Sequence, residues 1–136
     1  MTNETAAGQD LTRNQALVYG TLHDAHGPLS AYAILDRLRP DGLRAPQQIY
    51  RALDKLMEFG LIHRLESLNA FVACSHPAHE GHSVVAFAIC EACGNVSEFS
   101  EAALAEHLRR WADETGFRIK KSTIEVRGLC DGCAVA

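Results

Sequence analysis

The sequence has no long apolar run, no basic leader and few cysteines. Its longest apolar run, "VVAFAIC", is far too short to cross a bilayer. The opening residues, "MTNETAAGQD", contain no basic segment followed by an apolar stretch, so a signal peptide is not expected. We therefore expect a cytoplasmic protein without a membrane partner, in a compartment where thiols stay reduced. Paired cysteines in that compartment indicate a metal site rather than disulfides.

Positive charge is scarce overall but concentrated locally. The formal net charge is −4, which argues against a protein that binds nucleic acid through its whole surface. The second half of the chain is acidic, and a local basic patch on an acidic protein can still hold DNA phosphates. Such a patch lies within residues 37–55, which include Arg37, Arg39, Arg44, Arg51 and Lys55.

Length and composition limit the number of domains. A chain of 136 residues, of which 47% are apolar, can bury a core and is not disordered. It can hold one ordinary domain or two small ones. Each small domain would need a metal, a disulfide or a partner subunit, because little surface is buried at that size.

The first half of the chain predicts three helices followed by a β-hairpin. The capping-box pair Thr12 and Gln15 starts the first helix, Ser30 caps the second, and Pro46 suits the first turn of the third. The next stretch, "LIHRLESLNAFVAC", is typical of two strands around a bend at "SLNA". This order indicates a winged helix-turn-helix, in which the third helix enters the major groove of DNA. The first ten residues are polar and expected to be flexible.

The third predicted helix has a buried side and outer faces. Ile49, Leu53 and Leu56 follow the i, i+4, i+7 spacing of an apolar stripe. An arginine on an outer face can hydrogen-bond a guanine edge or a phosphate. The candidates for contacts with DNA on this helix are Gln47, Gln48, Tyr50, Arg51 and Lys55.

The second half predicts a separate, smaller unit. Residues 75–83, "SHPAHEGHS", contain Pro, Gly and histidines without apolar periodicity and indicate a hinge. Residues 84–136 then predict two strands around a "CEACG" knuckle, a helix from Ser100 to Gly116, and a last strand before a second knuckle. The expected fold class is α+β, with an N-terminal winged helix-turn-helix DNA-binding domain over residues 1–74 and a small C-terminal α/β domain.

Four of the five cysteines form two C-x-x-C pairs, one near each end of the smaller unit. Cys90 and Cys93 follow its first predicted strand, and Cys130 and Cys133 follow its last. Two residues between thiolates let one turn direct both sulfurs at a single ion, and structural zinc takes four such ligands in a tetrahedron. We expect a four-thiolate zinc that joins the first strand to the last and supplies folding free energy to a unit with little core. A redox pair or plain buried cysteines are the alternatives.

The fifth cysteine suggests a second metal site. If the hairpin bend is centred between Leu68 and Asn69, His63 and Cys74 face one another across the strands, close enough to be two ligands of one metal. A His/Cys/Glu set suits Zn²⁺. A buried apolar cysteine and solvated histidines are the alternative. Candidates for the remaining ligands are three hinge histidines and one carboxylate beyond the first knuckle: His76, His79, His82 and Glu98.

Together these segments resemble the ferric uptake regulator (Fur) family, most closely its zinc uptake regulator (Zur) branch. The resemblance rests on "LTRNQALVYGTLHDAHGPLSAYAILDRLR", "IYRALDKLMEFGLIHRLESLNAFVAC", "AICEACGNVSEF" and "GLCDGCAV", and it covers about residues 11–134. It implies a winged helix joined by a hinge to a dimerisation domain, in a homodimer that represses genes when loaded with metal. One departure is "QQIYR", which stands where "TVYR" or a similar segment is usual.

The resemblance also implies roles for single residues. Tyr32 and Arg51 match positions that touch DNA, and the DNA-reading helix maps onto residues 46–59. Zinc would then be bound twice per chain. The structural ligands matched are Cys90, Cys93, Cys130 and Cys133. The regulatory ligands matched are His63, Cys74, Glu98 and His82, with His79 as the fallback for His82.

The function implied is that of a zinc-responsive transcriptional repressor. Zinc at the inter-domain site would close the dimer for binding to palindromic operators of zinc uptake genes, with double-stranded DNA as the partner and no small organic substrate. An iron- or peroxide-responsive regulator of the same family is one alternative, although Fe(II) favours nitrogen and oxygen over the Cys74 thiolate. A zinc hydrolase or deaminase is disfavoured because neither H-E-x-x-H nor H-x-E with P-C-x-x-C occurs. A non-sensing zinc-ribbon adaptor would bind DNA without the second ion.

Overall fold

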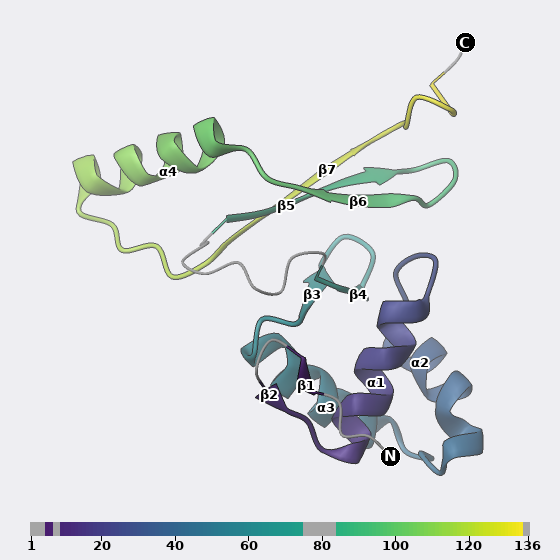
Figure 1. Cartoon of the computed structure of the whole chain (residues 1–136). Coiled ribbons are helices and arrows are strands. Elements are labelled where there is room, and N and C mark those ends of the chain that lie inside the picture. Colours follow the sequence, from purple (N-terminus) through teal and green to yellow (C-terminus); the bar gives the residue numbers. More distant parts are fainter. Residues whose placement is uncertain (1–4, 7–8, 75–83, 135–136) are drawn as a thin grey trace. The chain divides into compact units, whose positions relative to one another are not determined.

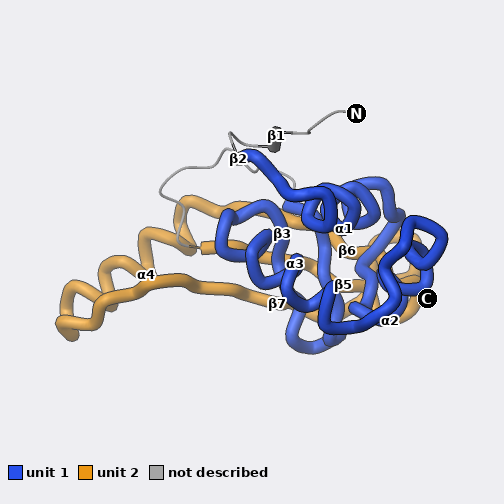
Figure 2. The backbone as a smooth tube through the Cα atoms, turned by 90° about the horizontal axis from the view of Figure 1, so that it is seen from below, with its two compact units in different colours: residues 1–78 blue, residues 79–136 orange. Residues whose placement is uncertain are grey.

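Two units make up the chain, residues 1–78 and residues 79–136 (Figures 1 and 2). The structure is a computed structural model that describes residues 5–6, 9–74 and 84–134. The predicted hinge, residues 75–83, lies outside the described residues. Within the described part, none of the helices combines the length and the apolar character needed to cross a bilayer.

The helices of the first unit begin where local signals predicted. The Thr12 hydroxyl accepts a hydrogen bond from the backbone N–H of Gln15, and the Gln15 side chain accepts one from the N–H of Thr12, which completes a capping box. The Ser30 hydroxyl accepts from the N–H of Ala33 at 3.1 Å. A short 3-10 helix after the second helix was not predicted. The elements are α1 (Arg13–Asp24), α2 (Ala31–Leu38), η1 (Arg39–Asp41) and α3 (Pro46–Glu58).

These helices surround one apolar core. The predicted stripe of α3, Ile49, Leu53 and Leu56, is fully buried at 0% exposure. Val18 of α1 and Ile34 of α2 are equally buried in the same cluster. Because the inner face of α3 is fixed in this way, its other faces are held in a defined orientation toward solvent.

A β-hairpin follows the helices, with β3 (Ile62–Leu65) antiparallel to β4 (Ala70–Ala73). The four-residue turn between the strands spans residues 66–69 and ends at Asn69, whose φ of 51° is left-handed. The Arg64 guanidinium holds this turn, since it donates to a Glu66 carboxylate oxygen and to the Asn69 side-chain oxygen at 3.0 Å each. The hairpin is thus the wing expected after the third helix.

The second unit is a three-stranded sheet with one helix. The central strand β5 (Val84–Cys90) pairs antiparallel with β6 (Val96–Phe99) and parallel with β7 (Ser122–Gly128). The helix α4 (Ala102–Thr115) connects β6 to β7 and lies at the end of the sheet away from the C-terminus of the chain (Figure 1).

The predicted start of this last helix at Ser100 is wrong. The helix begins at Ala102, and Glu101 occupies the N-cap in an extended conformation without a side-chain hydrogen bond. Ser100 lies one residue too early for its hydroxyl to cap the first turn, so the preference of serine for N-caps misplaced the boundary. The predicted end is right, because Gly116 has the left-handed φ of 74° that stops a helix.

Near the N-terminus, two short strands, β1 (Thr5–Ala6) and β2 (Gln9–Asp10), pair antiparallel. They lie within the ten residues expected to be flexible, and no residue pattern predicted them.

The second unit buries few large side chains. Among its described residues, Phe87 and Ile89 are the large apolar side chains with exposures of 1% and 3%. Small residues such as Ala86 and Ala112 complete its buried set together with Cys90. Several large apolar side chains remain about half exposed, namely Trp111, Phe117, Val126 and Leu129.

Candidate metal centres and nucleic-acid interface

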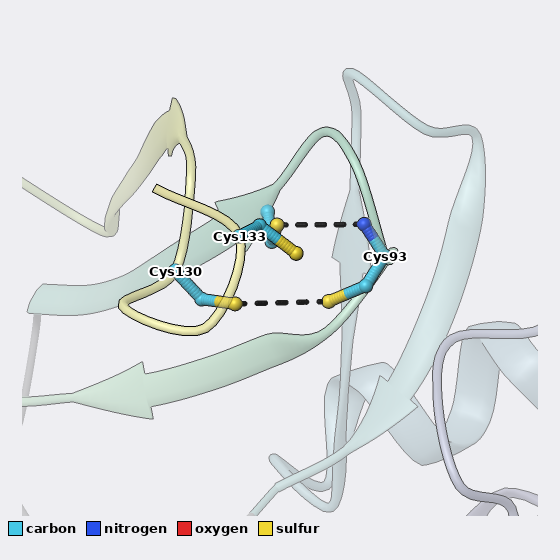
Figure 3. A group of neighbouring side chains, drawn as sticks. Cys93, Cys130 and Cys133 are labelled. Carbon is cyan, nitrogen blue, oxygen red and sulfur yellow. Dashed lines mark hydrogen bonds between the residues drawn. The ribbon is translucent and has the colours of Figure 1, made fainter. Parts of the chain in front are cut away.

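The four paired cysteines meet at one edge of the three-stranded sheet. Figure 3 labels three of them, Cys93, Cys130 and Cys133. Cys90 is the last residue of β5, and it pairs with Gly128, the last residue of β7. Because parallel strands end at the same edge of a sheet, the two C-x-x-C turns that follow them are neighbours. All four sulfur atoms lie within 4.8 Å of one another.

Each pair is presented by the same kind of turn. In the first, the N–H of Gly94 donates to the carbonyl of Cys90 at 2.9 Å, and Gly94 adopts a left-handed φ of 77°. In the second, the N–H of Ala134 donates to the carbonyl of Cys130 at 2.7 Å. The N–H of Cys93 also points at Cys90 Sγ, 3.4 Å away. Such turns direct two sulfurs to one side and place backbone N–H groups toward them.

The sulfur spacing fits a tetrahedral zinc site. The Sγ atoms of Cys93 and Cys130 point toward one another across the two turns at 3.8 Å (Figure 3). A tetrahedron with zinc–sulfur bonds of about 2.3 Å has edges of about 3.8 Å. Four soft thiolate donors at this spacing match the chemistry of structural zinc.

The thiols do not share one proton affinity. Backbone N–H groups of Cys130 and Cys93 lower the pKa of Cys90 to about 6, so this sulfur is largely a thiolate near neutral pH. Hydrogen bonds with the side chains of Cys130, Cys90 and Cys93 raise the pKa of Cys133 to about 12. The N–H of Asn95 lowers the pKa of Cys93. Hydrogen bonds with the side chains of Cys90 and Cys130 together raise this pKa by more, so the net shift is upward. Cys90 is thus the sulfur that carries the negative charge, whereas Cys93 and Cys133 keep their protons.

The predicted facing of His63 and Cys74 is wrong, although the two remain neighbours. His63 pairs with Val72, and the N–H of Cys74 donates to the carbonyl of Leu61 at 2.8 Å. The turn is therefore centred one residue earlier than expected, because it uses residues 66–69 instead of the bend "SLNA". Cys74 lies diagonally from His63 on the same face, since the side chains of a strand alternate with a period of two.

This diagonal arrangement still brings two ligand atoms together. A ring nitrogen of His63 and Cys74 Sγ lie within 4.8 Å of one another, and His63 is 9% exposed. No sequence pattern predicted a role for Tyr19 on α1. Burial raises the pKa of its phenol, and the charge of Cys74 raises this pKa further.

The other predicted ligands of the second site divide between two parts of the chain. His76, His79 and His82 lie outside the described residues. Glu98 lies on β6 of the second unit, where it pairs with Phe87 of β5 and is half-buried. Their role as ligands stays a prediction.

Most predicted DNA contacts lie on the surface of the first unit. Tyr32 on α2 is 61% exposed and Tyr50 on α3 is 44% exposed. Gln47, Arg51 and Lys55 are also exposed on α3, and Lys55 forms an ion pair of 3.1 Å with Glu58 in the last turn. Aromatic rings and an arginine on the outer faces of these two helices can contact bases and phosphates.

Two polar residues have roles that the sequence did not predict. Gln48 Oε1 accepts hydrogen bonds from the N–H groups of Arg44 and Ala45 at 2.9 and 3.1 Å, so it caps the start of α3. Arg13 of α1 donates to the carbonyl of Asp41 at 2.9 Å and thereby holds the connection that leads into α3. A glutamine at the third helical position is the one sequence signal that could have indicated the cap.

Comparison with known proteins identifies relatives of this arrangement. The sequence model of the Ferric uptake regulator family matches residues 11–127. The Zinc uptake regulation protein of Escherichia coli (strain K12) is 38% identical over 108 residues, which cover 79% of this chain and 63% of that protein. The Ferric uptake regulation protein of Neisseria gonorrhoeae is 29% identical over 87 residues, which cover 62% of this chain and 57% of that protein. The matched segment therefore spans less than two thirds of these relatives' length.

Solved structures show the same fold. The crystal structure of holo XcZur has a TM-score of 0.84 and 43% identity, and the match covers 95% of this chain and 89% of that one. A zinc uptake regulator complexed with zinc and DNA has a TM-score of 0.84 and 34% identity, over 91% of this chain and 83% of that one. These likenesses confirm the predicted α+β fold class, a winged helix-turn-helix followed by a small α/β domain.

Proposed function

Because this chain belongs to the ferric uptake regulator family, we propose that it is a zinc-responsive transcriptional repressor that binds double-stranded DNA as a homodimer. Its operators would be near-palindromic sites of zinc uptake genes. The family is one of transcription regulators, and the zinc uptake relative is more similar to this chain than the ferric one, at 38% against 29% identity. A relative with a TM-score of 0.84 has been solved with both zinc and DNA.

The neighbouring His63 and Cys74 are the observation that carries the zinc-sensing part of the proposal. An imidazole and a thiolate within 4.8 Å on one face of the wing supply two ligands of the kind that zinc prefers over Fe(II). His82, with His79 as the fallback, and Glu98 would complete four ligands. The structural zinc at the four paired cysteines is then a separate ion, so each chain would bind two.

The two sites would have different consequences. The thiolates of the paired cysteines would keep the second unit folded whether or not the cell is rich in zinc. His63 and Cys74 on the wing, together with His82 and Glu98 beyond the wing, would share the second ion and restrict the angle between the units. Both α3 helices of the dimer would then be held about one turn of DNA apart. Zinc and DNA would each tighten the binding of the other, as reciprocal coupling requires.

Exposed apolar side chains in the second unit support self-association there. Trp111 and Phe117 pack on one another with ring centroids 5.1 Å apart, yet they are 48% and 57% exposed. A second copy would cover such side chains through a two-fold interface. The proposal places the dimer in the cytoplasm, where thiol ligands stay reduced.

Zinc titration of DNA binding tests the proposal. An operator is first selected from randomised duplexes with zinc-loaded wild type, and its affinity is then measured by fluorescence anisotropy across free zinc concentrations. We expect wild type to bind two zinc ions per chain and Cys74→Ser to bind one. The factor by which zinc raises DNA affinity should be about 10-fold or more smaller in the variant than in wild type, which is within the range of allosteric coupling. The variant should remain dimeric by sedimentation.

Ala73→Ser is the matched control, because it adds the same hydroxyl one residue earlier on the opposite face of the strand. Unchanged zinc dependence in Cys74→Ser would remove the sensor role. Selectivity for Fe²⁺ over Zn²⁺ would favour an iron-responsive regulator, and metal-independent binding of the operator would favour an adaptor that does not sense.

A further inference from the structure

Two adjacent glutamines begin α3, and they have different surroundings. Gln48 Oε1 accepts hydrogen bonds from the backbone N–H groups of Arg44 and Ala45. Its own N–H donates to the carbonyl of Ala45 at 3.0 Å. Ala45 occupies the N-cap and has no side-chain oxygen, so Gln48 supplies the acceptor that this helix start would otherwise lack. The side-chain oxygen of Gln48 is therefore engaged by the protein's own backbone.

Gln47 lies on the opposite side of the helix from the core. Tyr50, Arg51 and Asp54 follow it at three, four and seven residues and are likewise exposed, so the four share one face. The inward face carries the fully buried stripe that starts at Ile49. Among the described residues, none forms a hydrogen bond with the Gln47 amide. Its donor and its acceptor both remain available to a ligand.

The chemistry of a glutamine at this place identifies the ligand. The N-terminal residues of a recognition helix are those that contact base edges in the major groove. A glutamine amide pairs with N6 and N7 of adenine, where its oxygen accepts and its nitrogen donates. A side chain whose oxygen already accepts two backbone N–H groups cannot make that pair without releasing the helix start.

We propose that Gln47 selects an adenine in each operator half-site, whereas Gln48 is a positioning residue that fixes the start of α3. This assignment rests on the proposed function as a DNA-binding repressor. It divides two chemically identical neighbours into a base-reading and a helix-capping role. The segment "QQIYR" would then prefer adenine at one base pair of each half-site, through its first glutamine.

Selection from randomised duplexes tests the division of roles. Zinc-loaded wild type, Gln47→Ala, Gln48→Ala and Gln48→Glu are each used to select operators, and thermal unfolding of each holoprotein is measured in parallel. We expect Gln47→Ala to lose its preference for adenine at one position per half-site, by about 10-fold or more, with unchanged melting temperature and unchanged preferences elsewhere.

The two Gln48 variants separate capping from reading. Gln48→Ala should lower the melting temperature and weaken binding to all duplexes alike, without changing base preference. Gln48→Glu keeps a carboxyl oxygen in place of the amide oxygen and should restore the melting temperature, because it can still accept from the backbone N–H groups of Arg44 and Ala45.

Each outcome is decisive. If wild type selects a defined site and Gln47→Ala selects the same site with the same preferences, the inference is overturned while the proposed function stands. It is also overturned if Gln48→Ala changes the preferred base. If wild type selects no site at any zinc concentration, the proposed function fails and the inference fails with it.

Discussion

Replacing Cys130 by serine should unfold the second unit and leave the first unit folded. Cys130 is one of four sulfurs that lie within 4.8 Å of one another, and its Sγ is 3.8 Å from that of Cys93. A serine hydroxyl stays protonated at neutral pH and does not replace a thiolate on zinc. The variant would therefore lose one ligand of the proposed zinc site, and with it the closure of the loop between the two knuckles.

The magnitude follows from what else stabilises this unit. Burial of Phe87 and Ile89 contributes about 1.5–3 kcal/mol for each side chain, and they are the large apolar residues with 1% and 3% exposure among its described residues. Binding of structural zinc contributes about 10–16 kcal/mol in zinc-finger peptides. A free energy of zinc binding in this range exceeds the free energy gained by burying these two side chains together. Packing of the apolar residues therefore cannot offset the loss of the zinc.

Hydrogen exchange read by mass spectrometry is the assay. We expect Cys130→Ser to lose protection throughout β5, β6 and β7 while α1 to α3 keep theirs, and native mass spectrometry should show the loss of one zinc. Cys74→Ser is the control, because it removes a thiol outside this cluster and should leave the sheet protected. Wild-type protection of β5 in Cys130→Ser would show that the unit folds without its metal and would refute the reasoning.

Three further predictions concern the core, a helix cap and protons. Leu53→Ala, at a position with 0% exposure, should lower the free energy of unfolding of the first unit by about 2–5 kcal/mol in urea denaturation, and a loss under about 1 kcal/mol would contradict the packing described. Ser30→Ala removes the hydroxyl that caps α2 and should cost about 0.5–2 kcal/mol in the same assay, whereas an unchanged midpoint would show that the cap is replaced. The raised pKa values of Cys93 and Cys133 keep both thiols protonated near neutral pH, and zinc must displace these protons. Zinc affinity at the proposed structural site should therefore fall by about 100-fold or more for each unit of decreasing pH near neutrality. Competition with a chelator at several pH values checks this, and a pH-independent affinity would disagree.

Local signals in the sequence predicted the first unit well. The side chains of Thr12 and Ser30 cap α1 and α2 as expected, because a cap depends on residues within one turn. The apolar stripe of α3 was equally readable, since helical spacing alone assigns its buried face. The start of α4 was misplaced because no side chain caps it, and a boundary without a local signal depends on the surrounding fold.

Pairings between distant segments were harder to predict. The hairpin register was misjudged because the bend was placed one residue too late, but the shared face of His63 and Cys74 survived the error. The cysteine spacing predicted that the first and last strands of the second unit would be joined. It did not predict that β5 and β7 pair directly and in parallel, since nothing local specifies which strands become neighbours. The cap made by Gln48 was missed for a similar reason, because an outward position was assumed to leave its side chain available.

The parallel pairing of β5 with β7 sets the order in which the chain can fold as it leaves the ribosome. Val84 pairs with Ser122, so β5 cannot complete its pairing until β7 has been synthesised. The second pair of cysteines is synthesised after β7. The helical core of the first unit needs nothing downstream, and domains generally fold in turn from the N-terminus during synthesis. In a nascent chain, the first unit can therefore be folded for the whole time that the two C-x-x-C pairs remain apart.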